Sequence, residues 1–181
     1  MITGPSIDSP RISGSQVLED EAGAGLIRPL QVGDRETLGS ILRRTEMFTE
    51  DEIAIAIELM DVVLDKPGQK DYLINVYHEG PACIGYYCIG PTPGTEGTFD
   101  LYWIAVDPVA QSKGIGRKLT DHAEQHIRSH RGRLIVAETS SQPRYGNTRR
   151  FYLSRGYNQL ARIPDYYRVG DDLIVYGKYL N

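Results

Sequence analysis

The most constraining feature of this sequence is a glycine-containing segment that joins a strand-like run to a helix-like run. Residues 98–106 read TFDLYWIAV, an apolar stretch of β-forming residues that ends at Asp107 and Pro108. Residues 111–119 read QSKGIGRKL, and apolar residues then recur at helical spacing as far as Arg131. The first turn of a helix has free N–H groups and the positive end of the helix dipole, so this segment predicts a phosphate-binding site.

Two better-known phosphate motifs do not fit the segment. The P-loop pattern GxxxxGK[ST] is absent, and Leu119 stands where the dinucleotide fingerprint requires its third glycine. Lys113, Arg117 and Lys118 add positive charge at the expected phosphate position, and the glycines let the backbone close around a pyrophosphate. Taken alone, the segment is also compatible with an ordinary strand–turn–helix connection.

The rest of the chain alternates between strand and helix patterns. Strands are expected at residues 26–29, 72–77, 82–89, 98–106, 134–139, 157–163 and 173–180. Helices are expected after Asp34, after the capping-box pair Thr49 and Glu52, over 114–131 and over 148–155. The order β-α-α-β-β-β-α-β-α-β-β predicts an α+β (mixed α/β) fold, in which about four helices flank a mostly antiparallel sheet of about seven strands.

The chain of 181 residues is expected to hold one domain, residues 26–181, preceded by a segment of different composition. Residues 1–25 contain no aromatic residue and are rich in Gly and Ser, which predicts a flexible tail. The alternative is a docked arm, which could contact a second copy of the chain in a homodimer.

Charge and cysteine content exclude several classes of function. The net charge of −4 provides no basic surface for nucleic acid or for an anionic membrane. Cys83 and Cys88 are five residues apart, so a regular strand would direct them to opposite faces. That spacing argues against a disulfide and, together with the lack of a secretory signal pattern, for a cytoplasmic protein.

Two motifs resemble those of the GNAT acetyltransferase superfamily. Residues 104–108, a short loop and then the QxxGxG pattern closely resemble motif A of that family. Residues 150–157, which read RFYLSRGY, resemble its later motif, in which an aromatic–Tyr pair precedes a Gly–aromatic pair. The expected order of elements from Leu26 to Leu180 is also similar to that of the family.

The resemblance implies that acetyl-CoA is the co-substrate and assigns positions to it. The backbone that would bond the pantetheine arm belongs to Ile104, Ala105 and Val106. The pyrophosphate loop would be formed by Gln111, Ser112, Lys113, Gly114, Ile115, Gly116 and Arg117. The resemblance also places Tyr152 near the sulfur of CoA, where it protonates the departing thiolate. The family often has Asn seven residues before that tyrosine; here Tyr145 stands there, and Asn147 is the nearest Asn.

Two carboxylates are candidates for the base that takes a proton from the acceptor amine. Asp100 lies four residues before Ile104, where histone-type members of the family carry a Glu, and Glu138 lies where ribosomal-protein-type members carry theirs. Of the two, Asp100 is preferred, and the alternative for each is a solvated carboxylate at a strand end. Residues 165–167 are expected in a loop, where an acidic aromatic wall would suit a cationic amine.

The sequence therefore predicts an acetyl-CoA-dependent N-acetyltransferase that acts on the primary amine of a small molecule, amino acid or peptide. A non-catalytic acyl-CoA-binding module of the same fold and a transferase for longer acyl groups are the alternatives. No metal is expected, because His122, His126 and His130 lack the HExxH pattern and a third ligand of another kind.

Overall fold

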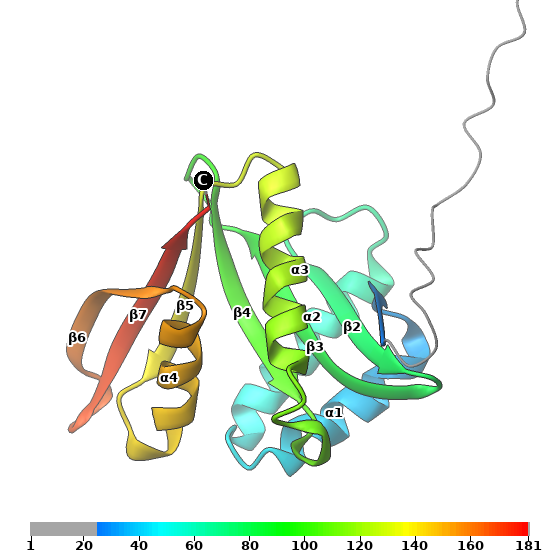
Figure 1. The fold of residues 1–181 in the computed structure, drawn as a ribbon, viewed down its shortest axis with the longest axis horizontal. Coiled ribbons are helices and arrows are strands. Elements are labelled where there is room, and N and C mark those ends of the chain that lie inside the picture. Colours follow the sequence, from blue (N-terminus) through cyan, green and yellow to red (C-terminus); the bar gives the residue numbers. More distant parts are fainter. Residues whose placement is uncertain (1–24, 181) are drawn as a thin grey trace, which may run out of the picture.

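The computed structural model describes residues 25–180, which form seven strands and four α-helices in the predicted order (Figure 1). The strands are β1 (Leu26–Pro29), β2 (Leu73–Glu79), β3 (Ala82–Pro91), β4 (Thr98–Val106), β5 (Leu134–Ser140), β6 (Asn158–Arg168) and β7 (Asp171–Tyr179). The helices are α1 (Arg35–Arg44), α2 (Glu50–Asp65), α3 (Ile115–Ser129) and α4 (Gly146–Ser154), with short 3-10 turns η1 (Val32–Asp34), η2 (Pro108–Ala110) and η3 (Pro143–Tyr145). The predicted α+β class is confirmed. Of the predicted tail, all but Gly25 lies outside the described residues.

The strands form a single sheet with the order β1-β2-β3-β4-β5-β7-β6. Every neighbouring pair is antiparallel except β4 and β5, which run parallel. This parallel pairing joins only Thr98–Asp100 to Leu134–Val136, and the two strands diverge beyond it (Figure 1). The sheet therefore opens in the middle, between β4 and β5.

Helices cover both faces of the sheet, and each face has its own apolar core. On one face α3 contributes Ile115, Leu119, Ala123 and Ile127, and α4 contributes Tyr152. On the other face α1 and α2 pack against β2, β3 and β4, with residues such as Leu42 and Met60 fully buried. Within residues 25–180, no helix has the length and apolar character needed to cross a bilayer.

Two β-bulges change which face the side chains of β3 and β4 point to. Ile84 has no partner on β2, because Tyr77 pairs with Gly85 and His78 with Cys83. The extra residue reverses the alternation, so Cys83 and Cys88 pack against the same core, and the predicted opposite orientation is wrong. Both cysteines are free thiols.

The last hairpin differs from the prediction. Residues 165–167 do not form a loop, because β6 continues to Arg168 and turns into β7 at Val169 and Gly170. The strand passes Pro164 through an irregular register between Ile163 and Arg168, with Asp165 at φ +53°. β6 tolerates Pro164 because it is the edge strand, where one side of the ladder needs no partner.

Candidate active site

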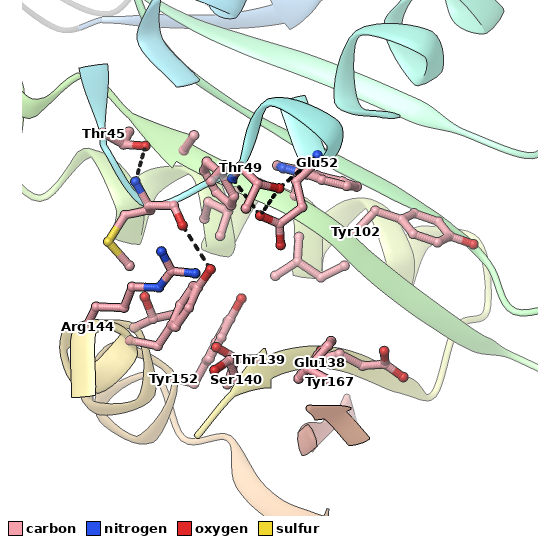
Figure 2. A pocket seen from close by; sticks show the side chains of 18 of the residues that line it. Thr45, Thr49, Glu52, Tyr102, Glu138, Thr139, Ser140, Arg144, Tyr152 and Tyr167 are labelled. Carbon is pink, nitrogen blue, oxygen red and sulfur yellow. Dashed lines mark hydrogen bonds between the residues drawn. The ribbon is translucent and has the colours of Figure 1, made fainter. Parts of the chain in front are cut away.

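A cavity of about 820 Å³ opens where β4 and β5 separate (Figure 2). Its walls come from the two diverging strands, from the segment between α1 and α2, and from the start of α4. The residues predicted from the sequence that line it are Asp100, Ile104, Ala105, Val106, Gln111, Glu138 and Tyr152. Residues from three separate stretches of sequence are thus brought together in one place.

The backbone of β4 offers unused hydrogen-bonding groups to this cavity. Beyond Asp100, β4 pairs only with β3, on the side away from β5. Backbone N–H and C=O groups strongly favour being paired. A ligand with its own amide groups could therefore complete the edge of β4 as a neighbouring strand would. This geometry fits the pantetheine arm, which contains two amides.

The segment between β4 and α3 has the form of an anion-binding loop. Ser112 and Gly114 have positive φ angles of +67° and +78°, and the loop folds back onto the first turn of α3. Within residues 25–180, no acceptor bonds the backbone N–H groups of 112–117. A Cβ at Gly114 would meet nothing within 4 Å, so the space beside the loop is open. The loop therefore fits a phosphate group.

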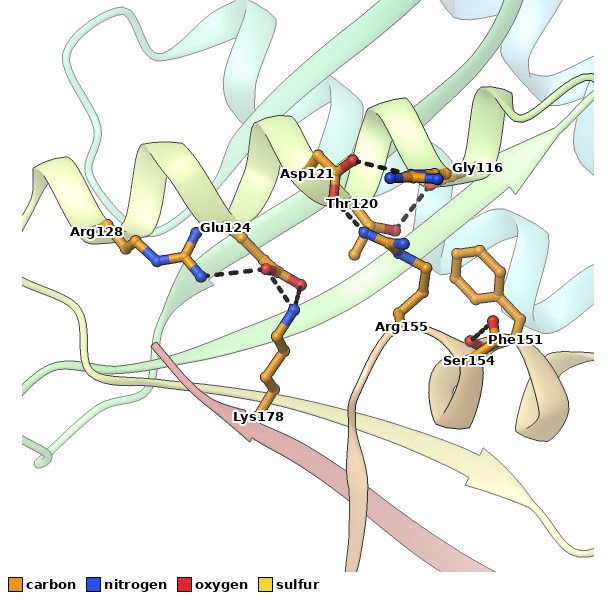
Figure 3. Close-up of polar contacts among 10 residues, drawn as sticks. Gly116, Thr120, Asp121, Glu124, Arg128, Phe151, Ser154, Arg155 and Lys178 are labelled. Carbon is orange, nitrogen blue, oxygen red and sulfur yellow. Dashed lines mark hydrogen bonds and ion pairs between the residues drawn. The ribbon is translucent and has the colours of Figure 1, made fainter. Parts of the chain in front are cut away.

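Gly116 has a packing contact that the sequence does not show. A Cβ at this position would lie 3.3 Å from Cε2 of Phe151, so the missing side chain lets α3 approach α4 (Figure 3). The hydroxyl of Thr120 donates to the carbonyl oxygen of Gly116 at 2.8 Å, and Asp121 forms an ion pair with Arg155. Gly116 thus lets the start of α3 pack closely on α4, and its place in the pyrophosphate loop stays a prediction.

Tyr152 lies beneath the opening between the strands, with 5% of its surface exposed. Its ring packs on Tyr176 at 5.7 Å and on Tyr157 at 5.4 Å between centroids, which fixes the direction of the side chain. No residue in the described part of the chain hydrogen-bonds its hydroxyl, and burial raises the pKa of that hydroxyl well above its ordinary value. The hydroxyl is therefore a protonated donor available to a ligand.

The two candidate bases lie on the neighbouring strands β4 and β5, close to the point where these strands separate. Asp100 is the last residue of β4 that pairs with β5, and it accepts a hydrogen bond of 2.8 Å from the Thr92 hydroxyl. Glu138 lies two residues beyond its partner, Val136. Burial and the negative charge of Asp100 raise the pKa of Glu138. The two carboxylates are thus close enough to interact electrostatically.

Sequence reasoning missed several residues that line the cavity. They include Glu52, whose pattern indicated only a helix cap, and the aromatic residues Phe48, Tyr102 and Trp103. Of the acidic aromatic wall expected at residues 165–167, Tyr167 does line the cavity. Tyr102 occupies the second bulge, because Cys88 pairs with Trp103 and Ile89 with Leu101. No signal in the sequence marks that bulge, but the capping-box spacing does place Glu52 in the first turn of a helix.

Tyr145, at the position where the family often has Asn, lines the cavity, whereas Asn147 does not. The hydroxyl of Tyr145 donates to the backbone oxygen of Met47 at 2.8 Å, tying η3 to the segment before α2. Asn147 does not line the cavity, and its side-chain oxygen accepts from Arg150. Thr148 lines the cavity one residue later. The contact predicted for Asn147 would therefore lie outside the cavity.

Three histidines in or directly after α3 and one mixed cluster are groups of potential metal ligands among the described residues. Nδ1 of His122 lies 2.8 Å from the Tyr87 hydroxyl, and His126 stacks on His130 at 4.1 Å between ring centroids. Among residues 25–180, one group has the spacing of a metal site: Asp34, His78 and Cys83, with ligand atoms within 4.8 Å. Arg28 donates to both carboxylate oxygens of Asp34, at 2.7 and 2.9 Å. Its guanidinium already supplies the positive charge at this group.

Comparison with solved structures identifies the family. A protein from Desulfovibrio desulfuricans assigned to the GNAT family of acetyltransferases is 38% identical, with a TM-score of 0.85, over 87% of this chain and 100% of that one. This chain belongs to the GNAT family. A profile of the GNAT acetyltransferase domain matches residues 70–159. No curated protein sequence matches the chain.

More distant GNAT structures share the fold. The ribosomal-protein-S18-alanine N-acetyltransferase of Escherichia coli is 20% identical, with a TM-score of 0.69, over 87% of this chain and 95% of that one. A protein from Salmonella typhimurium, assigned as an acetyltransferase and solved with its cofactor acetyl-CoA, is 21% identical with a TM-score of 0.68. It matches over 87% of this chain and 95% of its own. The separated strands therefore belong to a fold that binds acetyl-CoA in a relative.

The loop before α3 can be tested with a matched pair of substitutions. Asp and Asn both tolerate positive φ, so Gly114→Asp and Gly114→Asn should strain the backbone similarly. We expect Gly114→Asp to bind CoA about tenfold more weakly than Gly114→Asn, a difference of about 1.4 kcal/mol, because only the carboxylate repels phosphate. Titration calorimetry with CoA measures both. Equal affinities for the two variants would contradict the assignment of the loop.

Proposed function

We propose that this GNAT-family protein transfers an acetyl group from acetyl-CoA to a primary amine of a small molecule, amino acid or peptide. One observation carries the proposal: a single cavity contains the open edge of β4, two carboxylates on neighbouring strands, and a protonated tyrosine hydroxyl that no residue of 25–180 hydrogen-bonds. Acetyl-CoA supplies the activated acyl group, so the protein needs no nucleophile of its own. Its residues need to position two ligands and to move protons.

The acceptor must lose a proton before its nitrogen can attack. A lysine-like amine has a pKa of about 10.4 and is almost entirely protonated at neutral pH. A base with a pKa closer to neutrality removes the proton more effectively than an ordinary carboxylate. The raised pKa of Glu138 therefore supports Glu138 as the base. Asp100, preferred on sequence grounds, would then keep the pKa of Glu138 high through its negative charge.

Two further groups act on the acetyl end of the reaction. In the proposal, those backbone N–H groups of residues 104–106 that point away from β3 donate to the carbonyl oxygen as negative charge develops on it. The hydroxyl of Tyr152, whose pKa is raised by burial, holds a proton that the leaving sulfur can take. We assign the general-acid role to Tyr152 and cofactor contacts to residues 104–106 and 111–117.

The role of Tyr152 can be separated from a structural role by Tyr152→Phe. We expect kcat for thiol release from acetyl-CoA to fall about 100-fold, since a positioned acid typically contributes that much, with little change in acetyl-CoA affinity. The free energy of unfolding should change by less than about 0.5 kcal/mol, because the ring stays and its hydroxyl has no protein partner. Wild-type turnover between pH 6 and 9 would contradict the assignment. Wild-type protein that binds acetyl-CoA but acetylates no amine would instead be the non-catalytic module.

The base is identified by the acid limb of the pH–rate profile. Glu138 must be ionised to accept a proton, so the rate should fall as the pH falls through its pKa, which lies above the ordinary value of about 4.3. Asp100→Asn removes a negative charge, lowers the pKa of Glu138 and should shift this limb to lower pH while kcat is largely kept. Glu138→Gln should abolish the limb and most of kcat. If Asp100→Asn lost the activity and Glu138→Gln kept it, Asp100 would be the base and the assignment of Glu138 would be wrong.

A further inference from the structure

Three carboxylates at the cavity have no cationic partner. Within the described part of the chain, no Lys, Arg or His nitrogen lies within 4.0 Å of Glu52, Asp100 or Glu138. By contrast, Asp171 at the same cavity pairs with Arg168 at 3.7 Å. The reaction requires one base, so the cavity has more negative charge than proton transfer alone explains.

Glu52 is held in place by the start of α2. Its Oε2 accepts hydrogen bonds from the backbone N–H of Thr49 at 2.7 Å and from the Thr49 hydroxyl at 2.9 Å. The side chain is half-buried, and Figure 2 shows it on the α2 wall of the cavity, across from Glu138 on β5. The capping box therefore presents a fixed carboxylate to the cavity on the side opposite the candidate bases.

Aromatic side chains line the same cavity as these carboxylates. Phe48 lies 6.3 Å from Trp103 between ring centroids, and Tyr102 and Tyr167 also line the cavity. Burial and the charges of Glu138 and Glu52, among others, raise the pKa of Tyr167 to about 12, so Tyr167 lies within electrostatic reach of both carboxylates. Carboxylates combined with aromatic faces suit a ligand that carries positive charge on an aliphatic chain.

Among residues 25–180, one arginine at the cavity has no carboxylate partner and can bind an anionic group. Arg144 lines it, is exposed, and lies over the ring of Tyr145 at 5.0 Å. In this part of the chain, three carboxylates at the cavity are unpaired, against one unpaired cation. The excess of negative charge favours an acceptor with at least two positive charges over a zwitterion such as a free neutral amino acid.

We propose that the acceptor is a small aliphatic diamine or polyamine, in which one amine reacts beside Asp100 and Glu138 while a second ammonium group pairs with Glu52. This inference rests on the proposed N-acetyltransferase function. In the reaction, the amine nitrogen bonds to the acetyl carbon as the carbon–sulfur bond breaks. Glu138 takes the proton that the ammonium group must lose before attack. The sulfur receives a proton from Tyr152, and the second proton lost by the nitrogen after the carbon–nitrogen bond forms returns through solvent to Tyr152. The products are a mono-acetylated amine and the CoA thiol.

The test compares two acceptors of equal length, 1,5-diaminopentane and n-hexylamine, which differ in whether the far end is charged. Wild-type protein should acetylate the diamine with a kcat/KM about tenfold or more above that of hexylamine, as expected when a partly buried charge finds its partner. Glu52→Gln should reduce kcat/KM for the diamine about tenfold and change that for hexylamine by less than about twofold. Glutamine also serves in a capping box, so the fold should be retained, and the melting temperature verifies this.

Glu50→Gln is the matched control for Glu52→Gln. Glu50 lies in the same turn of α2 and loses the same charge, but it does not line the cavity and pairs instead with Arg43 at 3.5 Å. Glu50→Gln should leave unchanged the ratio of kcat/KM for 1,5-diaminopentane to kcat/KM for n-hexylamine. Equal use of diamine and hexylamine by the wild type, or an unchanged ratio in Glu52→Gln, would overturn the inference and leave the proposed function standing. Thiol release with no amine at all would overturn the proposed function as well.

Discussion

The parallel pairing of β4 and β5 ends after Asp100 and Val136, and the rest of the site depends on this early separation. In a continuous sheet, the backbone groups of residues 101–106 would bond to β5 and no ligand could reach them. Because the strands diverge, the edge of β4 stays open, Tyr152 is reached from the gap, and Glu138 lies just past the point of separation. Past the point of separation, β4 continues into the loop before α3, and β5 continues into the turn before α4. These two helices lie beside the opening (Figure 1).

A sheet that is paired so briefly in the middle must be held together by other contacts. Glu124 of α3 is 3% exposed and binds Nζ of Lys178 on β7 at 2.7 and 2.9 Å (Figure 3). The ion pair between Asp121 and Arg155 joins α3 to the end of α4. The pair between Glu124 and Lys178 is costly to break by removing Lys178, because the carboxylate of Glu124 would stay buried without this partner. Side chains beneath the gap thus replace the missing strand pairing between the two halves of the sheet.

Much of this architecture could be predicted from the sequence because it depends on local patterns. The limits of β1 and β4 and the capping box at Thr49 follow from alternation, breakers and cap spacing, and the structure confirms all three. The two bulges could not be predicted, since one extra residue in a strand leaves no local signal. For the same reason, the prediction that Cys83 and Cys88 point to opposite faces was wrong.

The candidate site could be predicted only where a motif carried it. Gly116 was identified by its motif, but its contact with Phe151 depends on how closely two helices approach, which sequence does not report. Glu52 was recognised for its local role as a cap, whereas its position at the cavity depends on how α2 docks on the sheet. The continuation of β6 past Pro164 likewise depends on its being an edge strand.

The central claim is that the cofactor completes the open edge of β4 and lies on the loop before α3. Residue-resolved hydrogen exchange of the backbone amides, measured with and without saturating CoA, tests it most directly. The account predicts slower exchange at amides within 104–106 and 112–117 when CoA is bound, with no change in β1 at the far edge of the sheet. Unchanged exchange in both segments under conditions where CoA is bound would contradict it.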